Sequence, residues 1–248
     1  MTYHAPHSVD QALAFLAGGA ASIVAGGTDF FPALRKGQGP ETLIDISQIA
    51  DLKGIVDTGD GWRIGAATTW SAIADADLPR VFDALRAAAK EVGSVQIQNA
   101  GTIGGNLCNA SPAADGIPPL LTLDAQVELT GPAGKRRLAL SDFILGVRHT
   151  VLGDEELLTS ILIPSQPPHL VSTFEKLGSR RYLVISISMV SVVVGLEDGV
   201  ITDIRVAVGA CSAVAQRQPH LESALIGVVA KQALVTTDML RDLAPIAD

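Results

Sequence analysis

The sequence predicts an α+β protein made of three successive regions, residues 1–55, 56–166 and 167–248. In the first region, short apolar runs alternate with helical spacing, which is typical of a small α/β lobe. In the second, turn residues separate several strands from one long apolar helical face, which indicates an α+β lobe. The third holds three apolar runs, the last two joined at a turn, which favours an antiparallel sheet. The prolines of Ser165–Pro168 interrupt both periodicities and separate the last two regions.

The first region predicts a strand, a loop and a helix in succession. Ser8–Gln11 has the pattern of a capping box that opens a helix. Ser22–Ala25 is a short apolar run typical of a buried strand, and it leads directly into Gly26–Asp29. Phe30–Lys36 then has helical spacing, and Thr42–Ile46 predicts a second strand.

The second and third regions predict hairpins and one amphipathic helix. Gly59–Gly61 turns the chain into Trp62–Ala67, which is expected to be a hairpin strand. Apolar residues at helical spacing between Val81 and Val92 predict a helix that ends at Gly93. The remaining expected strands are 126–130, 135–140, 156–163, 171–177, 184–196 and 200–208, followed by weak helical patterns from Pro219 onward.

Composition and charge argue against several kinds of partner. With 248 residues, 48% of them hydrophobic, the chain can bury a substantial core. Its formal charge is −8 and its longest basic run is Lys135–Arg137, which disfavours a nucleic-acid surface because phosphate binding relies on clustered cations. The most apolar run, Leu183–Leu196, is shorter than the roughly 20 residues of a membrane span. Since Met1–Pro6 lacks the features of a secretory signal, we expect a cytoplasmic protein without a membrane span.

The cysteines and histidines predict no metal site on this chain. Cys108 and Cys211 have no CxxC partner and cannot supply the four thiolates that an iron–sulfur cluster or a structural zinc site usually takes. The five histidines show no HxxxH or HxH spacing. Any iron–sulfur chemistry linked to this protein must therefore belong to another chain. Cys108 is expected to be a small buried filler.

Two glycine-rich segments carry the main functional signal. Ala25–Asp29 follows a predicted strand, and Asn99–Asp115 combines glycines with small hydroxyl and amide side chains, which suits a loop laid against a polar ligand. Backbone N–H groups of such turns can converge on an anion, and a following helix adds favourable partial charge. Neither segment matches the Rossmann GxGxxG fingerprint or the P-loop motif GxxxxGK[ST]. Taken alone, each is more often an ordinary turn.

Taken together and in this order, the motifs resemble one family. Ile23–Asp29, Thr102–Asn106 running on into Ala110–Asp115, and Phe174–Lys176 followed by Arg180–Arg181 resemble the FAD-binding medium subunit of molybdenum hydroxylases, a family that includes xanthine, carbon monoxide, nicotine and nicotinate dehydrogenases. The resemblance extends from the N-terminus to about Pro219. It implies a two-lobed FAD-binding domain of the vanillyl-alcohol-oxidase (PCMH) type, followed by a small domain with a three-stranded antiparallel sheet and helices. Similar subunits usually continue beyond the length of this chain.

The resemblance also implies where FAD binds. Its diphosphate is expected between Ile23–Phe30 and Thr102–Asn106, with the threonine hydroxyls and glycine amides of both loops as donors to phosphate oxygens. A phosphate would repel Asp29, so we expect that residue to cap the helix after it. The complete set of cofactor-binding residues implied in this way is Ile23, Val24, Ala25, Gly26, Gly27, Thr28, Asp29, Phe30, Val92, Thr102, Ile103, Gly104, Gly105, Asn106, Asp115, Leu158 and Lys176.

Four of these residues are expected near the flavin and each has a simpler alternative. Asp115 matches an acid that hydrogen-bonds the ribityl chain, but it also suits a helix cap. Lys176 matches a lysine near the flavin ring, where a cation stabilises the anionic reduced flavin, but it also suits a solvated strand. Val92 and Leu158 match apolar positions that pack on the isoalloxazine, and core packing explains them equally well.

A few positions depart from the family pattern or stay open. Gln98 stands where relatives often have a basic residue, which removes one charge from the phosphate side of the site. Arg180, Arg181 and Tyr182 suit either the flavin surroundings or an exposed corner.

The resemblance implies an electron-transfer subunit with no catalytic residue of its own. Electrons would come from a molybdenum cofactor in a large partner subunit, cross [2Fe–2S] clusters in a small partner subunit, and reach an external acceptor by way of FAD on this chain. The common assembly in the family is a dimer of three-subunit units. The alternatives are a free-standing flavin oxidase of the same fold with its own small substrate, and a nonredox nucleotide-binding module.

Overall fold

The first lobe is a small parallel sheet with two helices. The structure is a computed structural model that describes residues 1–34, 39–180 and 183–240. Strands β1 (Thr2–His4), β3 (Thr42–Asp45) and β2 (Ser22–Val24) pair in this order, both pairs parallel. Helix α1 (Val9–Leu16) begins at Ser8, whose side chain accepts a hydrogen bond from the Gln11 N–H, so the predicted cap is confirmed. Helix α2 (Phe30–Ala33) follows β2, and the rest of the expected helix runs into residues outside the described part.

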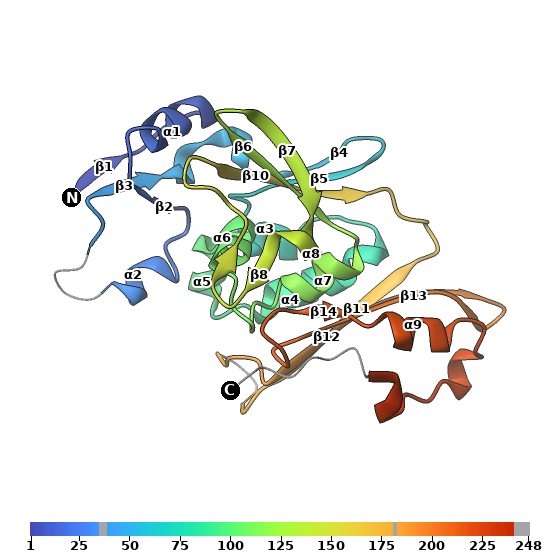
Figure 1. Ribbon diagram of the computed structural model, residues 1–248. Coiled ribbons are helices and arrows are strands. Elements are labelled where there is room, and N and C mark those ends of the chain that lie inside the picture. The colour runs from blue at the N-terminus through green and yellow to red at the C-terminus, as the bar shows by residue number, and fades with distance from the viewer. Residues whose placement is uncertain (35–38, 181–182, 241–248) are drawn as a thin grey trace.

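The second lobe is an antiparallel sheet covered on one side by helices. Its strands lie in the order β4, β5, β10, β6 and β7, and helices α3 to α8 lie between this sheet and the C-terminal sheet, as Figure 1 shows. The strand bounds are β4 Ile55–Asp57, β5 Gly61–Gly65, β6 Gln126–Gly131, β7 Gly134–Ala139, β8 Ile144–Gly146, β9 His149–Thr150 and β10 Leu157–Pro164. The helix bounds are α3 Trp70–Ala74, α4 Asp83–Glu91, α5 Val95–Ala100, α6 Ile103–Asn109, α7 Ile117–Thr122 and α8 Leu140–Phe143. Short 3₁₀ helices occupy Ile46–Gln48, Ala50–Leu52, Arg80–Phe82, Ala230–Gln232 and Thr237–Leu240.

The segment expected as one glycine-rich loop contains a helix. Residues Ile103–Asn109 form α6, whose first turn is capped by the Thr102 hydroxyl through a 3.1 Å hydrogen bond from the Gly105 N–H. The helix packs closely on the chain after β5, because the N–H of Gly104 donates to the Ala66 carbonyl at 2.8 Å. Glycines are poor helix formers, so this contact and the cap override their local preference.

The C-terminal region is an antiparallel sheet of four strands. Three strands were expected, and β11 (Val171–Leu177), β12 (Ser188–Glu197) and β13 (Val200–Gly209) are joined by a two-residue fourth strand, β14 (Gln216–Arg217). Strand β12 begins at Ser188 and not at the expected residue 184, and Ser186 in the stretch before it donates to the Asp115 carboxylate. Helix α9 (Pro219–Leu225) packs on β13.

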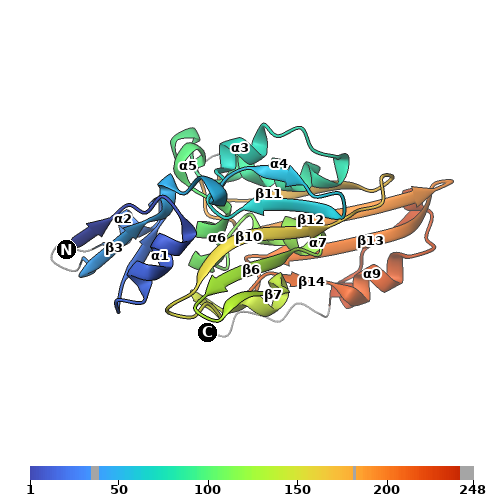
Figure 2. The same ribbon diagram turned by 90° about the horizontal axis from the view of Figure 1, so that it is seen from above.

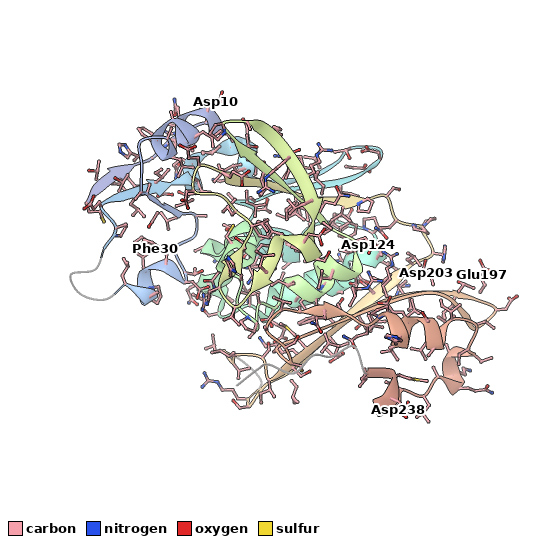
Figure 3. The ribbon with its side chains drawn as sticks, viewed as in Figure 1. Asp10, Phe30, Asp124, Glu197, Asp203 and Asp238 are labelled. Carbon is pink, nitrogen blue, oxygen red and sulfur yellow. The ribbon has the colours of Figure 1, made fainter. Side chains whose placement is uncertain are left out.

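Ion pairs and apolar contacts fix this sheet to the central helices. Arg205 and Arg217 both bind the Asp124 carboxylate, at 2.9 and 2.8 Å. Asp124 and Asp203 lie at this junction in Figure 3, where Asp203 also pairs with Arg205 at 3.5 Å.

Figure 2, viewed from above, shows the first lobe at one end of the molecule and the C-terminal sheet extending towards the other. Within the described ranges, no helix is long and apolar enough to cross a membrane.

Candidate cofactor-binding site

A cavity of about 770 Å³ lies between the first two lobes. Its volume falls within the range of about 300–1,000 Å³ that is usual for small-molecule and cofactor sites. The wall from the first lobe is the β2–α2 connection, which ends at Phe30 on the edge of α2 (Figure 3). The opposite wall comes from α6, the end of α4 and strand β10. Of the sequence-predicted residues, all but Ile103, Asp115 and Lys176 line this cavity.

The first glycine segment leaves hydrogen-bond donors open towards the cavity. Within the part of the chain that the structure describes, the N–H groups of Gly26, Gly27 and Thr28 donate to no acceptor, and the Thr28 hydroxyl has no partner. Gly26 lies so close to the second lobe that an added Cβ would sit 1.8 Å from the Ala100 carbonyl oxygen. Gly27 has φ of 68°, a left-handed conformation that glycine adopts without strain. This segment can therefore present several donors to an anion.

Asp29 does not cap α2. It occupies the position before the helix, but its carboxylate makes no capping bond. Instead Oδ2 accepts a 2.8 Å hydrogen bond from Nδ2 of Asn109, at the end of α6. The expectation of a cap was wrong, because this contact with the second lobe takes the carboxylate away from the helix amides.

The second glycine segment has its donors already in use. The N–H of Gly104 donates to the Ala66 carbonyl at 2.8 Å, and the N–H of Gly105 donates to the Thr102 hydroxyl oxygen at 3.1 Å. An added Cβ at Gly104 would lie 2.6 Å from the Ala66 oxygen, so this glycine permits close backbone packing. Contrary to expectation, these two amides are not open to a phosphate. Ile103 is fully buried and belongs to the core.

Asn106 supplies an unsatisfied polar group beside the cavity. Its Oδ1 atom is buried and has no hydrogen-bond partner among the described residues. Buried side-chain acceptors are nearly always paired, because an unpaired one costs about 1–3 kcal/mol. The atom lies close to Gly116, which is not part of the cavity lining, so it is an orphaned acceptor behind the cavity wall. The open amides of the first glycine segment are therefore the groups that suit a polar ligand in the cavity.

Asp115 and Lys176 form a buried ion pair with each other. The Lys176 ammonium lies 2.7 Å from Oδ2 of Asp115, and each side chain is only 7% exposed. Ser186 donates a 2.6 Å hydrogen bond to Oδ1 of the same carboxylate, and Lys176 also donates to the Glu91 carbonyl at 3.3 Å. Desolvation raises the pKa of Asp115, although the hydrogen bonds from Lys176 and Ser186 oppose this effect.

This pair differs from both simpler alternatives. Helix α7 begins after Gly116 with no side-chain cap, so Asp115 is not a helix cap. Lys176 is buried and not a solvated strand residue. Its position beside Glu91 places the pair next to Val92, which lines the cavity. Lys176 itself lines a second hollow of about 490 Å³, together with Glu91.

The remaining expected positions are distributed as follows. Val92 and Leu158 line the cavity as apolar walls. Cys108 lies partly buried in the cavity wall, and burial raises the pKa of its thiol to about 12, which disfavours the thiolate form. Gln98 donates to the Lys90 carbonyl at 2.8 Å. Arg180 is exposed and bonds to the Leu183 carbonyl, whereas Arg181 and Tyr182 lie outside the described residues.

Sequence reasoning missed several residues that line the cavity. Gly101 lies within the glycine-rich segment Asn99–Asp115, so composition could have indicated it. Leu157 directly precedes Leu158, which was predicted, and it lies in the expected strand 156–163, so the strand pattern could have indicated it. Asn109 and Arg148 also line the cavity and bond to each other through their side chains. No local pattern points to Arg148, because it lies on the β8–β9 hairpin, far along the chain from both glycine segments.

Comparisons with known proteins agree with this architecture. Residues 1–166 match the family described as the FAD binding domain in molybdopterin dehydrogenase, and residues 173–246 match the CO dehydrogenase flavoprotein C-terminal domain. A solved structure of carbon monoxide dehydrogenase from Hydrogenophaga pseudoflava, which lacks the Mo-pyranopterin moiety of its cofactor, has a TM-score of 0.85 at 31% identity, covering 96% of this chain and 83% of the other. The fold is thus that of a flavoprotein subunit.

Curated relatives point to the same family. The xanthine dehydrogenase FAD-binding subunit of Escherichia coli O157:H7 is 32% identical over 253 aligned positions, covering 98% of this chain and 86% of the relative. The nicotinate dehydrogenase FAD-subunit of Eubacterium barkeri is 37% identical over 182 positions, covering 71% of this chain and 62% of the relative. The chain belongs to the FAD-binding domain family of the molybdopterin dehydrogenases, and its cofactor is FAD.

Proposed function

We propose that this chain is the FAD-binding electron-transfer subunit of a multi-subunit molybdenum hydroxylase. It would take electrons from [2Fe–2S] clusters on a partner and pass them through FAD to an external acceptor. The observation that carries the proposal is the cavity between the lobes, where the open amides of Gly26, Gly27 and Thr28 face a second glycine segment. The family match and the relatives' names support it.

The cavity residues have distinct roles in holding the cofactor. We assign the diphosphate to the open amides of Gly26–Thr28 and to the Thr28 hydroxyl, since these donors have no protein partner. Asn106 is assigned a contact with the cofactor, because it lines the cavity from α6. Val92 and Leu158 form apolar walls suited to the isoalloxazine. FAD, when bound, supplies the redox chemistry, and the protein supplies position and electrostatics.

The Asp115–Lys176 pair is proposed to act as a unit beside the flavin ring. Because the two side chains neutralise each other, the net charge that this pair contributes is smaller than that of a free lysine. Lys176 also donates to the carbonyl of Glu91, the residue before Val92, and so holds one cavity wall in place. This arrangement fixes an ammonium group near the cavity while keeping it away from solvent.

The partners follow from the proposed function. We propose a large subunit with the molybdenum cofactor and a small subunit with [2Fe–2S] clusters, in a dimer of three-subunit units in the cytoplasm. A relative from Hydrogenophaga pseudoflava is named a carbon monoxide dehydrogenase medium chain, which supports a multi-subunit assembly. This chain spans 62% of the length of the Eubacterium barkeri relative.

The test compares the isolated chain with its native complex. The isolated chain, purified with FAD, should be yellow. It should pass electrons from NADH or another reductant through FAD to artificial acceptors, but it should not oxidise a hydroxylase substrate. The complex copurified from its source should contain molybdenum, iron and FAD together. Substrate turnover by the isolated chain would instead establish a free-standing oxidase, and a colourless chain that takes up no FAD would contradict the proposal.

A further inference from the structure

The β8–β9 hairpin brings one arginine, Arg148, to the wall of the cavity. Arg148, at the turn of this hairpin, has φ of 58°, and its N–H donates to the Ala110 carbonyl at 2.9 Å. Ala110 ends α6 and is itself left-handed, with φ of 45°. Left-handed backbone at a non-glycine residue is uncommon and persists where surrounding contacts hold it. The hairpin is therefore anchored to the end of the helix that forms one wall of the cavity.

The side chain of Arg148 completes a polar bridge across three segments. Its guanidinium donates to Oδ1 of Asn109, and Nδ2 of Asn109 donates to Oδ2 of Asp29 at 2.8 Å. All three residues line the cavity, and they come from the β2–α2 connection, α6 and the β8–β9 hairpin. Among the described lining residues, Arg148 is the one cation and Asp29 the one carboxylate.

The charge balance of the cavity favours an anion contact by this arginine. A diphosphate held at the amides of Gly26–Thr28 would lie next to the negative charge of Asp29, which opposes binding. Neither glycine segment, Ile23–Phe30 or Thr102–Asn106, contains a lysine or an arginine. A guanidinium carries five N–H donors in a planar fork suited to phosphate oxygens, and the structure shows Arg148 using one side-chain partner.

We propose that Arg148 binds the diphosphate of the cofactor and supplies the positive charge that the two glycine segments lack. Asn109 positions the guanidinium and separates it from Asp29. Because Arg148 makes no direct ion pair with Asp29, its remaining N–H donors can bind phosphate oxygens. The inference rests on the proposed placement of FAD between the two glycine segments. It adds a contact from a third segment, the hairpin, to the same site.

Arg148→Gln tests the proposal by FAD titration of the purified chain over a range of KCl concentrations. Loss of one charge-assisted hydrogen bond should raise the FAD dissociation constant by about tenfold at low salt. In the wild type the dissociation constant should rise with salt, because salt screens the attraction, and this dependence should weaken in the variant. Arg148→Lys keeps the charge and should restore the salt dependence, with affinity between those of the other two.

Arg80→Gln is the matched control. It removes the same charge from a side chain that is 78% exposed, pairs only loosely with Asp83 at 3.8 Å and lies outside the cavity. It should bind FAD as the wild type does. An Arg148→Gln variant with wild-type affinity, or with weaker affinity but unchanged salt dependence, would overturn the assignment to the diphosphate. A wild-type chain that binds no FAD would instead contradict the proposed function.

Discussion

The two glycine segments that face each other across the cavity do different work. Around Gly26 and Gly27 the backbone donors are open, and glycine allows the segment to approach the second lobe without a side chain in between. Around Gly104 and Gly105 the backbone donors are occupied, and glycine allows α6 to pack on the Ala66 backbone. Similar composition therefore serves a binding surface in one case and a packing surface in the other.

The two segments differ in whether their backbone N–H groups already have acceptors in the protein. This property distinguishes a binding loop from a structural one. Gly26, Gly27 and Thr28 are partly exposed in the cavity wall, so their N–H groups are available to a bound ligand, whereas the N–H groups of Gly104 and Gly105 are already paired. The two threonines follow the same division. Thr102 is 6% exposed and caps α6, whereas the Thr28 hydroxyl has no partner. Substitutions in the two segments should consequently separate cofactor affinity from stability.

Gly26→Ala is expected to have the largest effect. The new Cβ would lie 1.8 Å from the Ala100 oxygen, so the segment must move away from the second lobe and lose the geometry of its donors. We expect a loss of about 3 kcal/mol or more in FAD binding, about 100-fold in the dissociation constant, measured by fluorescence titration. Gly146→Ala is the control, since its Cβ meets no atom within 4 Å. Equal FAD affinity in the two variants would refute the close approach at Gly26.

Gly104→Ala should mainly lower stability. Its Cβ would lie 2.6 Å from the Ala66 oxygen and 2.7 Å from the Ala66 Cβ, which forces α6 away from the sheet. We expect the free energy of unfolding of the FAD-free chain to fall by about 1–3 kcal/mol, as measured by urea denaturation. A variant that keeps its stability but loses FAD would show that this segment binds phosphate directly and does not serve mainly for packing.

The two threonines give a smaller, paired test. Thr102→Val removes a helix cap and should cost about 1 kcal/mol of unfolding free energy. Thr28→Val removes a hydroxyl without a protein partner, so it should leave the FAD-free chain as stable as the wild type and weaken FAD binding about three- to tenfold. Thermal denaturation and FAD titration of both variants check this. If Thr28→Val lowered stability and Thr102→Val weakened only FAD binding, the assignment of binding to the first segment and packing to the second would be wrong.

The smallest effect is expected from Asp115→Asn, as a pH dependence. Burial raises the pKa of Asp115 above its ordinary 3.8. Between pH 3.8 and the raised pKa, the folded chain therefore binds more protons than the unfolded chain. Its contribution to the unfolding free energy is present at low pH and is lost as pH rises through the raised pKa. The stability of the wild type relative to the variant should therefore decrease as pH rises from about 3.8. Urea denaturation at several pH values measures it, and an increasing difference would contradict the shift.

Local patterns in the sequence predicted most of the fold. The cap at Ser8 is confirmed because its bond to the Gln11 N–H depends on residues three apart. The expected hairpins and the boundary region between the last two sheets follow from turn residues and alternation, which are also local. Helix α6 was missed because two adjacent glycines disfavour a helix, and only the Thr102 cap and the contact with Ala66 make it stable.

The site was predicted where it lies in continuous segments and missed where it depends on distant contacts. The glycine segments carry their signal in composition, and the family resemblance joined them. The ion pair of Asp115 and Lys176 joins positions 61 residues apart, and the Asp29–Asn109 bond joins positions 80 apart. No periodicity encodes such pairs. Arg148 was missed for the same reason, since its approach to the cavity depends on how the hairpin docks on α6.

A crystal structure of the chain with FAD bound would show directly which glycine segment holds the diphosphate. We predict that the amide nitrogens of Gly26, Gly27 and Thr28 lie about 2.7–3.2 Å from diphosphate oxygens, while the Gly104 amide keeps its bond to Ala66. A diphosphate bonded to the amides of Gly104 and Gly105, or placed outside the cavity between the lobes, would contradict it.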